Sequence, residues 1–338
     1  MGKKKAAVTL HDVANKTGVS VSTVSRVLAG KEYISPRTRQ KVMATVAEMN
    51  YSPNAMARGL KSGQSNMIAL VIPSIHNLMF PVLTRGVEDT ARKNGYMVIL
   101  CNTDEDTDAE KGYITKLRNS WVDGMIFATM LPDSHYIREL RQSGFPVVLT
   151  SRAYDKTIDA VVIDNVSASY DATCYLIGKG YRRIAFAMGP DFQLYEDRFQ
   201  GYCNALKENG IPFDERLVMH ETDGVNSFAG LIRKMIEEQG KPDAVFASTD
   251  NRAIVIMRTL YDMGFRIPDD IAVMGFDNVD FSSLVEPPLS TVSQPLYDIG
   301  ATATRRLIHQ IRAVRNTGVL DPPVVEQLET HLLIRQST

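Results

Sequence analysis

The chain has 338 residues, 44% hydrophobic and 23% charged, which is the composition of an ordinary globular protein of two or three domains. Its three widely spaced cysteines, Cys101, Cys174 and Cys203, exclude a dense disulfide framework and favour a reducing compartment. No run reaches the roughly 18 apolar residues of a membrane span, and no apolar segment follows the basic residues 3–5 as a signal peptide requires. We therefore expect a cytoplasmic protein that does not contact a membrane.

The net charge of −1 conceals an asymmetry along the chain. Residues 1–63 hold 11 Lys and Arg against 3 Asp and Glu, whereas the remaining residues hold 27 against 36. A basic segment joined to an acidic body is typical of a small nucleic-acid-binding module on a domain that itself avoids DNA.

Residues 9–28 predict two short helices joined by a tight turn. Thr9 can cap the first helix, with Asp12 in capping-box position, and Gly18 ends it because glycine readily adopts the left-handed conformation. Ser20 can cap the second helix, which runs to about Leu28 with its apolar side chains at helical spacing.

The outer face of this second helix is suited to a DNA major groove. It carries Val21, Ser22, Ser25 and Arg26. Serine donates to phosphates, small side chains let the backbone approach, and arginine can donate two hydrogen bonds to guanine. The alternative is a helical hairpin that only packs and binds no ligand.

A third helix is predicted from Pro36 to about Met49, because Ser35 can cap it and proline is favoured at the first helical position. Residues 51–65 then form a linker in which a short helix, 55–60, contains Gly59. Glycine within a helix costs about 1 kcal/mol relative to alanine, so this helix should be marginal alone. A disordered tether is the alternative.

The sequence to this point closely resembles the LacI/GalR family of bacterial transcription regulators. The resemblance is carried by residues 8–14 (VTLHDVA), 18–20 (GVS), 23–27 (TVSRV) and 51–60 (YSPNAMARGL), with His11 as a departure from the tyrosine or lysine common there. It implies a hinge helix that folds only on operator DNA, where Leu60 would wedge into the minor groove. The residues expected on DNA are Thr9, Val21, Ser22, Thr23, Ser25, Arg26, Asn54, Ala57 and Leu60.

Beyond residue 66, buried strands alternate with helices, and this predicts doubly wound parallel sheets with ligands at the strand carboxyl ends. The predicted strands are 67–72, 96–101, 124–128, 147–150, 160–163, 183–188, 217–220, 244–247 and 271–275. The predicted helices are 80–94, 108–118, 133–142, 167–178, 198–208, 227–238 and 251–263. Two successive sets predict two α/β lobes, and the resemblance implies the periplasmic-binding-protein type I fold.

The predicted fold is therefore an all-α helix-turn-helix head (1–50), a hinge or linker (51–65) and an effector-binding and dimerisation core (66–338). The last segment, with a strand at 290–294, a helix at 295–314 and strands at 324–329 and 331–335, resembles the family's crossovers between lobes. The N-terminal lobe is expected to comprise about 66–163 and 294–323. The C-terminal lobe is expected to comprise about 164–293 and 324–338.

Polar residues at the ends of the predicted strands should converge on a cleft between the lobes. The expected effector contacts are Ser74, Asn77, Phe80, Arg152, Arg198, Asp250 and Asp277. Amides, carboxylates and guanidinium groups beside a ring suit a polyhydroxylated ligand, and the resemblance points to Arg198, Asp250 and Asp277 in particular. Arg152 and Arg198 together would suit a sugar acid or sugar phosphate, unless Arg152 pairs with Asp155 or Asp159.

The sequence contains no standard catalytic motif, among them HExxH, GxSxG, a P-loop, CxxC and GxGxxG, and its six histidines are scattered. We expect neither enzyme activity nor a cofactor nor a metal site. The predicted function is a homodimeric repressor that binds a near-palindromic operator under control of a small sugar-like effector. A neutral sugar or nucleobase is the alternative effector. A transport-type sugar receptor of the same fold is the alternative function, against which the basic head argues.

Overall fold

The structure, a computed structural model, describes residues 8–28, 30, 33–51, 64–119, 121–128, 135–151, 156–222 and 224–338. It consists of two compact units, a head (residues 1–65) and a core (residues 66–338). The expected hinge helix, with Asn54, Ala57 and Leu60, lies outside the described residues, as does Arg152. Among the described residues, no helix is long and apolar enough to cross a membrane.

The head is a cluster of three helices, α1 (Leu10–Thr17), α2 (Val21–Leu28) and α3 (Pro36–Glu48). A capping box begins α1, and Gly18, with φ of 65°, ends it, as the sequence predicted. The Ser35 hydroxyl accepts from the backbone N–H of Thr38 at the start of α3. A small apolar core holds the three helices together, formed by Val13, Ala14, Val24, Val27 and Val42.

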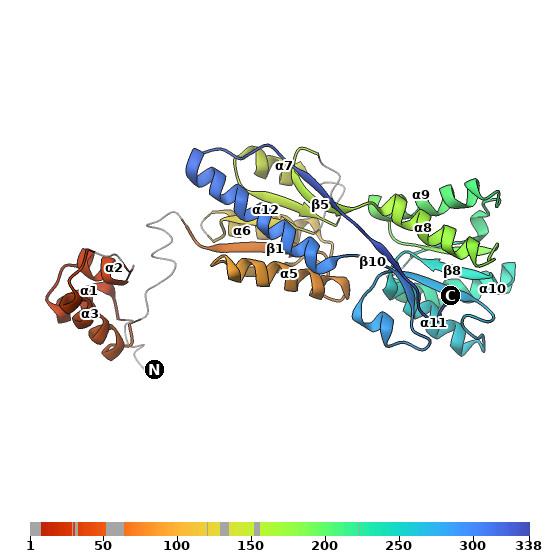
Figure 1. Ribbon diagram of the computed structural model, residues 1–338, viewed down its shortest axis with the longest axis horizontal. Helices are drawn as coiled ribbons and strands as arrows, with labels where there is room; N and C mark the ends of the chain where they lie inside the picture. Colours follow the sequence, from red (N-terminus) through yellow and green to blue (C-terminus); the bar gives the residue numbers. More distant parts are fainter. Residues whose placement is uncertain are drawn as a thin grey trace. The chain divides into compact units, whose positions relative to one another are not determined.

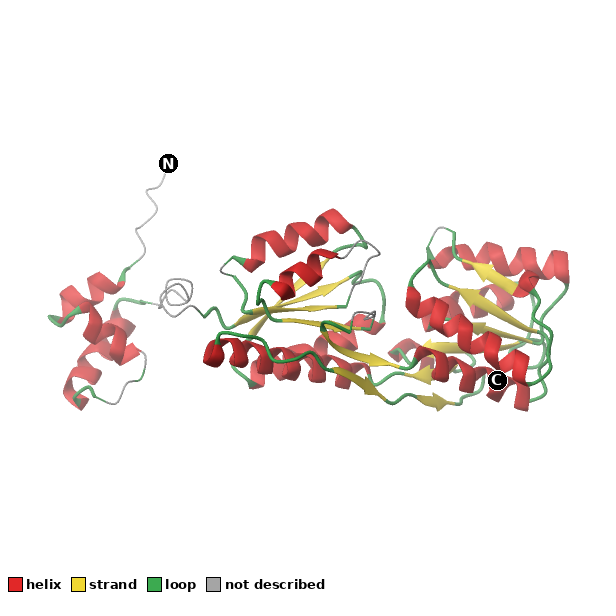
Figure 2. Cartoon of the chain, turned by 90° about the horizontal axis from the view of Figure 1, so that it is seen from above, coloured by secondary structure: helices red, strands yellow, loops and turns green. Residues whose placement is uncertain are grey.

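The N-terminal lobe of the core is a six-stranded parallel sheet in the order β11-β5-β4-β3-β1-β2. Its strands are β1 (Met67–Ile72), β2 (Met97–Asn102), β3 (Gly124–Phe127), β4 (Val147–Thr150), β5 (Asp159–Ile163) and β11 (Val325–Leu328). Its helices are α5 (Met79–Lys93), α6 (Thr107–Arg118), α7 (His135–Gln142) and α12 (Leu296–Thr317). Apolar runs such as β1 form strands here because both faces of the sheet are covered by helices (Figure 2).

The C-terminal lobe repeats this plan with the order β12-β10-β9-β8-β6-β7. Its strands are β6 (Ile184–Met188), β7 (Val218–His220), β8 (Ala244–Ala247), β9 (Ala272–Asp277), β10 (Ser290–Ser293) and β12 (His331–Leu333). Its helices are α8 (Asn165–Gly178), α9 (Gln193–Glu208), α10 (Phe228–Gln239) and α11 (Asp250–Asp262), with short 3-10 helices at 215–217, 225–227 and 280–283. All strand pairs are parallel except the edge pair β10–β12.

The chain passes between the two lobes after β5, after β10 and after β11 (Figure 1). Because β11 pairs with β5 in the N-terminal sheet, the expected assignment of residues 324–328 to the C-terminal lobe is wrong. Only β12 and the residues after it return to the C-terminal lobe. Helix α12 packs against α5, and a Cβ atom on Gly86 or Gly300 would collide with the facing backbone, so glycine at both positions permits the close approach.

Candidate DNA-binding helix and effector cleft

Helix α2 of the head has two chemically distinct faces. Val24 and Val27 are buried in the head core, whereas Ser22 and Arg26 are exposed. Ser25 is half-buried between these faces. The predicted DNA contacts Ser22, Ser25 and Arg26 therefore lie on accessible parts of the helix, and a groove could approach them without disturbing the core.

Four of the predicted DNA contacts have structural partners within the head, Ser22 among them, because its hydroxyl shares a hydrogen bond of 2.8 Å with that of Ser20. The Thr9 hydroxyl donates to the Asp12 carboxylate at 2.7 Å, and the Thr9 backbone N–H donates to the same carboxylate at 2.8 Å. The Thr23 hydroxyl shares a hydrogen bond with Ser20, which caps α2. Val21 packs partly against the apolar core. Their contacts with DNA stay a prediction, because the contacts that the structure shows are helix caps and packing.

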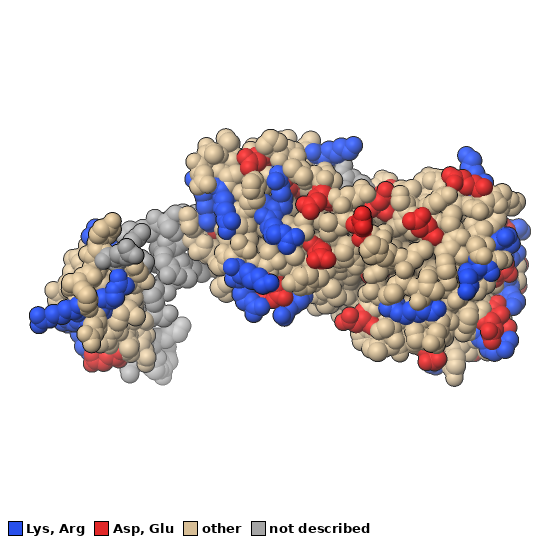
Figure 3. Space-filling model, in the orientation of Figure 1, with Lys and Arg blue, Asp and Glu red and all other residues tan. Residues whose placement is uncertain are grey.

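The charge asymmetry of the sequence is visible on the molecular surface. On the face shown in Figure 3, the exposed charges of the head are mostly basic, whereas both signs are interspersed over the core. This distribution makes the head the unit suited to a polyanion.

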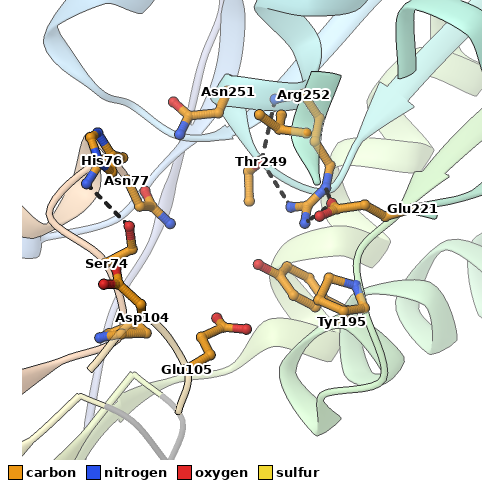
Figure 4. Close-up of a pocket in the computed structure, with 13 residues that line it drawn as sticks. Ser74, His76, Asn77, Asp104, Glu105, Tyr195, Glu221, Thr249, Asn251 and Arg252 are labelled. Atoms are coloured by element: carbon orange, nitrogen blue, oxygen red, sulfur yellow. Dashed lines mark hydrogen bonds and ion pairs between the residues drawn. The ribbon is translucent and has the colours of Figure 1, made fainter. Parts of the chain in front are cut away.

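The core contains a cavity of about 330 Å³ between its two lobes (Figure 4). Its N-terminal wall is formed by Pro73, Ser74, His76, Asn77, Asp104 and Glu105. Its C-terminal wall is formed by Pro190, Tyr195, Glu221, Val225, Thr249, Asn251 and Arg252. These residues follow the carboxyl ends of β1, β2, β6, β7 and β8, as the doubly wound fold requires.

A smaller cavity of about 20 Å³ shares Asn77, Tyr195 and Thr249 with the first. Its remaining lining residues are Met79, Phe80, Ser151, Leu194, Arg198, Asp277 and Gln294. The structure therefore brings five of the seven expected effector residues to the inter-lobe region: Ser74, Asn77, Phe80, Arg198 and Asp277.

Arg198 and Asp277 form a buried ion pair, with Arg198 Nη1 at 3.6 Å from Asp277 Oδ1. Arg198 Nε also donates to Asn165 Oδ1 at 2.8 Å, and its guanidinium lies over the Phe276 ring. Gln294 Nε2 donates to the same carboxylate oxygen, Asp277 Oδ1, at 2.6 Å. Burial raises the pKa of Asp277 to about 7, although Arg198 opposes this shift. The pair thus joins α9 to the carboxyl end of β9.

Asp250 does not reach the cleft, contrary to the expectation from the resemblance. It is fully buried, and it accepts from the Val279 backbone N–H at 2.9 Å and from the Thr291 hydroxyl at 2.6 Å. Burial raises its pKa to about 6. Its carboxylate joins the start of α11 to β10, so we assign it a structural rather than an effector-binding role.

Sequence reasoning missed a second buried ion pair, Arg252–Glu221. Arg252 Nε donates to Glu221 Oε2 at 2.8 Å, and Arg252 Nη1 lies 3.0 Å from Thr249 Oγ1. The guanidinium also lies 4.6 Å from the centroid of the Tyr195 ring. No local sequence pattern predicts this pair, because its two residues follow different strands and are 31 residues apart in the chain.

Five described non-glycine residues with a left-handed backbone lie at strand ends beside the cleft, whereas Asn50 and Asn66 lie elsewhere. The five are Asp104 (φ 51°), Glu105 (φ 61°), Ser151 (φ 64°), Asp277 (φ 124°) and Asn278 (φ 59°). Such conformations cost on the order of 1–3 kcal/mol each and concentrate at ligand sites. Two polar atoms in this region, Ser151 Oγ and Asn251 Oδ1, are buried and have no hydrogen-bond partner among the described residues.

The described residues contain no group of three or more His, Cys, Asp or Glu arranged to hold a metal ion. The lining of the two cavities combines hydroxyl, amide, carboxylate and guanidinium groups with the rings of Tyr195 and Phe80. Such a lining binds a small polar molecule.

Comparison with protein families gives two matches. Residues 9–54 match the family described as bacterial regulatory proteins, lacI family. Residues 65–324 match the family described as periplasmic binding proteins and sugar binding domain of LacI family.

Individual proteins are similar over almost the whole chain. Catabolite control protein A of Priestia megaterium is 36% identical over 98% of this chain and 99% of its own length. The ribose operon repressor of Halalkalibacterium halodurans is 37% identical over 98% of this chain and 97% of its own length. Among solved structures, the Lac repressor dimer bound to operator and the anti-inducer ONPF has a TM-score of 0.86 at 27% identity, covering 98% of this chain and 99% of that one. The complex of the transcriptional regulator CelR with cellobiose has a TM-score of 0.73 at 30% identity. The match covers 98% of this chain and 100% of that one.

Proposed function

Since the chain belongs to the LacI family of bacterial regulatory proteins, we propose that it represses transcription by binding operator DNA as a homodimer. A small carbohydrate-related effector in the inter-lobe cleft sets its affinity for that DNA. Like its relatives, the chain is a DNA-binding transcription regulator and not an enzyme. Its place of action under this proposal is the bacterial cytoplasm, where operator DNA is found.

The main observation in support of the proposal is that one face of α2 packs against the head core while the other face is accessible. Arg26 is exposed one turn after Ser22, while the intervening Val24 is fully buried. An exposed arginine on a helix that enters the major groove can donate two hydrogen bonds to a guanine, which contributes about 1–3 kcal/mol of discrimination. The proposal further assigns Asn54, Ala57 and Leu60 to the minor groove at the centre of the operator, with Leu60 as the wedge.

The test begins with selection of binding sites from a randomised near-palindromic duplex pool by the full chain. Arg26→Ala should then weaken binding to the selected operator by about 1–3 kcal/mol and relax one base preference. Arg37→Ala is the matched control, because it removes the same charge from an exposed position on α3. Equal losses on operator and random DNA for Arg26→Ala would show that Arg26 contacts only phosphate.

The effector part of the proposal rests on the cleft. Binding between two lobes can favour one angle between them, and a change of angle is transmitted through the three crossings to the residues that precede β1. By linkage, an effector that changes operator affinity has its own affinity changed by operator to the same extent. Calorimetric titration of effector with and without operator should therefore give two different dissociation constants for the effector, and equal constants would refute the coupling.

The dimer part of the proposal rests on exposed apolar side chains of the core. Strand β2 is an edge of its sheet, and its Met97 is 71% exposed, with Leu100 also exposed. On the C-terminal lobe, Tyr261 and Leu284 are 70% and 75% exposed. Exposed apolar side chains on an edge strand are typical of a protein–protein interface. We propose that a second copy of this chain binds there. The solved Lac repressor structure named above is a dimer on operator.

Light scattering tests this assignment. Met97→Asp combined with Tyr261→Asp should convert the dimer into a monomer, because each charge would be buried in the interface. Phe213→Asp is the control. Phe213 is also exposed, but it belongs neither to β2 nor to the pair formed by Tyr261 and Leu284. A double variant that remains a dimer would place the interface elsewhere.

A further inference from the structure

The core begins at Asn66, and two hydrogen bonds hold the backbone of this residue. Its N–H donates to Asp123 Oδ2 at 2.9 Å, and its carbonyl accepts from the Met97 N–H at 2.9 Å. Its φ of 53° is left-handed, a conformation that asparagine tolerates but that persists only where the surroundings hold it. The core therefore begins with a turn whose direction is fixed by its neighbours.

An ion pair keeps the acceptor of this turn in place. Asp123 Oδ2, the same oxygen that accepts from Asn66, lies 2.6 Å from Arg315 Nη2 in the last turn of α12. The side chains of Asp123 and Arg315 are 10% and 26% exposed, so water screens their attraction only in part. The Arg315 guanidinium also lies 5.9 Å from the centroid of the Tyr96 ring. Asp123 thus joins the first residue of the core to α12.

Helix α12 is itself fixed to the N-terminal lobe. Asp159 is fully buried at the start of β5, and it accepts from Arg306 Nε and Gln310 Nε2, both on α12. The helix has 22 residues and is therefore about 33 Å long. It runs along the N-terminal lobe from the crossing after β10 (Figure 1). Because α12 and the sheet hold each other at several points, Asn66 is attached to the lobe as a whole.

The fixed turn lies beside the surface that we assign to the dimer. Asn66 is bonded to the backbone of Met97, and the exposed side chain of Met97 belongs to that surface. In such a dimer the two chains leave their cores next to the contact between the copies. A near-palindromic operator presents two half-sites at a set spacing, so a fixed starting point for each head reduces the entropy lost when both heads bind.

We propose that Asp123 and Arg315 are positioning residues for operator binding. They fix the point from which the chain leaves the core, and in this way they place the two heads of a dimer for the two half-sites. Both act through Asn66 and need no contact with DNA. This inference rests on the proposed function, to which it adds the residues that link core and operator.

The test compares the selected operator with a duplex that holds a single half-site. Fluorescence anisotropy measures the dissociation constant of the full chain for each duplex, and a half-site engages one head without any spacing requirement. Asp123→Ala removes the acceptor of both contacts, so it should weaken operator binding at least fivefold and leave half-site binding within twofold of wild type. Removing a carboxylate would strengthen DNA binding through charge alone, so net charge cannot produce this loss.

Graded variants separate the two contacts. Asp123→Asn keeps an oxygen that can accept from the Asn66 N–H, so it should lose less operator affinity than Asp123→Ala. Arg315→Gln breaks only the ion pair and should weaken operator binding two- to fivefold. Arg305→Gln is the matched control, because Arg305 is exposed on the same helix and donates to Thr302 of that helix. A control that loses as much operator affinity as Arg315→Gln would assign the effect to charge and overturn the inference.

The remaining outcomes also decide the question. Light scattering checks that each variant is a dimer, and if Asp123→Ala is not, Asp123→Asn and Arg315→Gln are compared in its place. Wild-type affinity of the compared variants for the operator would overturn the inference, as would equal losses on operator and half-site, and either result leaves the proposed function intact. Protein that selects no DNA sequence contradicts the proposed function and, with it, the inference.

Discussion

Helix α2 of the head and the cleft of the core use polar side chains in opposite ways. In α2, Ser22 and Arg26 are exposed, and the head core is formed by other residues on the far face. In the cleft, Arg198 pairs with Asp277 and Arg252 pairs with Glu221, all in buried surroundings. On α2, Ser22 and Arg26, which are predicted to bind DNA, are therefore distinct from the residues that form the head core, whereas the cleft residues named above also stabilise the core through their ion pairs.

This difference has a consequence for mutational data. A substitution on the exposed face of α2 should change DNA binding with little change in the free energy of unfolding. A substitution in a cleft ion pair changes both, so loss of effector response in such a variant does not by itself identify a ligand contact. The following measurements test that contrast.

The largest effect is expected for Arg252→Ala. This change leaves Glu221 as a mostly buried carboxylate without its cation, and breaking a buried pair in this way costs about 3–5 kcal/mol. Chemical denaturation of the core should show this loss of stability. Arg258→Ala on the same helix removes an exposed pair with Asp262 and should cost no more than about 1 kcal/mol. Similar losses for the two variants would contradict the contrast between buried and exposed pairs.

The next effect concerns pH. Because burial raises the pKa of Asp277 from 3.8 to about 7 in the folded protein, the folded state binds more protons than the unfolded state between these values. Its contribution to stability therefore falls as pH rises from about 4 to about 7. Asp277→Asn lacks this titration, so its stability relative to wild type should improve by a few kcal/mol between pH 5 and pH 8. Parallel stability curves for the two proteins would refute the raised pKa.

A smaller effect is expected for Asn165→Ala. Asn165 is buried and accepts from Arg198 Nε, so the change leaves a buried donor without its partner at a cost of about 1–3 kcal/mol. Effector affinity should fall as well, because Arg198 loses its support. Asn226→Ala, in the short helix before α10, is the control and should change neither quantity. A loss of affinity at unchanged stability would make Asn165 a ligand contact instead.

The smallest effect is expected for Thr9→Ala in the head. Loss of a helix cap costs about 0.5–2 kcal/mol, and the capping box of α1 depends on Thr9. If Thr9 acts only as a cap, affinity for the operator should stay close to wild type below the melting temperature of the head. Thr9→Ser, which keeps the hydroxyl, should restore stability. If Thr9→Ala weakens operator binding while leaving the head as stable as before, then Thr9 contacts DNA and is more than a cap.

Most of the fold could be predicted because its signals are local. The strands at 67–72, 147–150 and 244–247 have the predicted bounds, since each is an apolar run between polar residues. The start of α9 was missed by five residues: the helix begins at Gln193 rather than Arg198. Its N-cap residue, Phe192, has no side-chain capping bond, so the sequence carried no start signal there.

The site could be predicted only where strand order determines position. Ser74 and Asn77 follow β1 directly, so the fold alone places them at the cleft. The partners of a buried charge are set by packing between loops distant in sequence, and for this reason the roles of Asp250 and Arg252 were not foreseen. The membership of 324–328 in the N-terminal sheet was missed for the same reason, since β11 and β12 are separated only by residues 329–330 but join different sheets.

The position of β11 also fixes the order in which a ribosome completes this protein. The head ends before residue 66, whereas the N-terminal sheet gains its last strand only when residue 328 has been made. At about 5–20 residues per second, synthesis of the intervening stretch takes roughly half a minute. Throughout that interval a nascent chain carries a complete head without a complete core, so a product truncated there would lack both the effector cleft and the surface that we assign to the dimer.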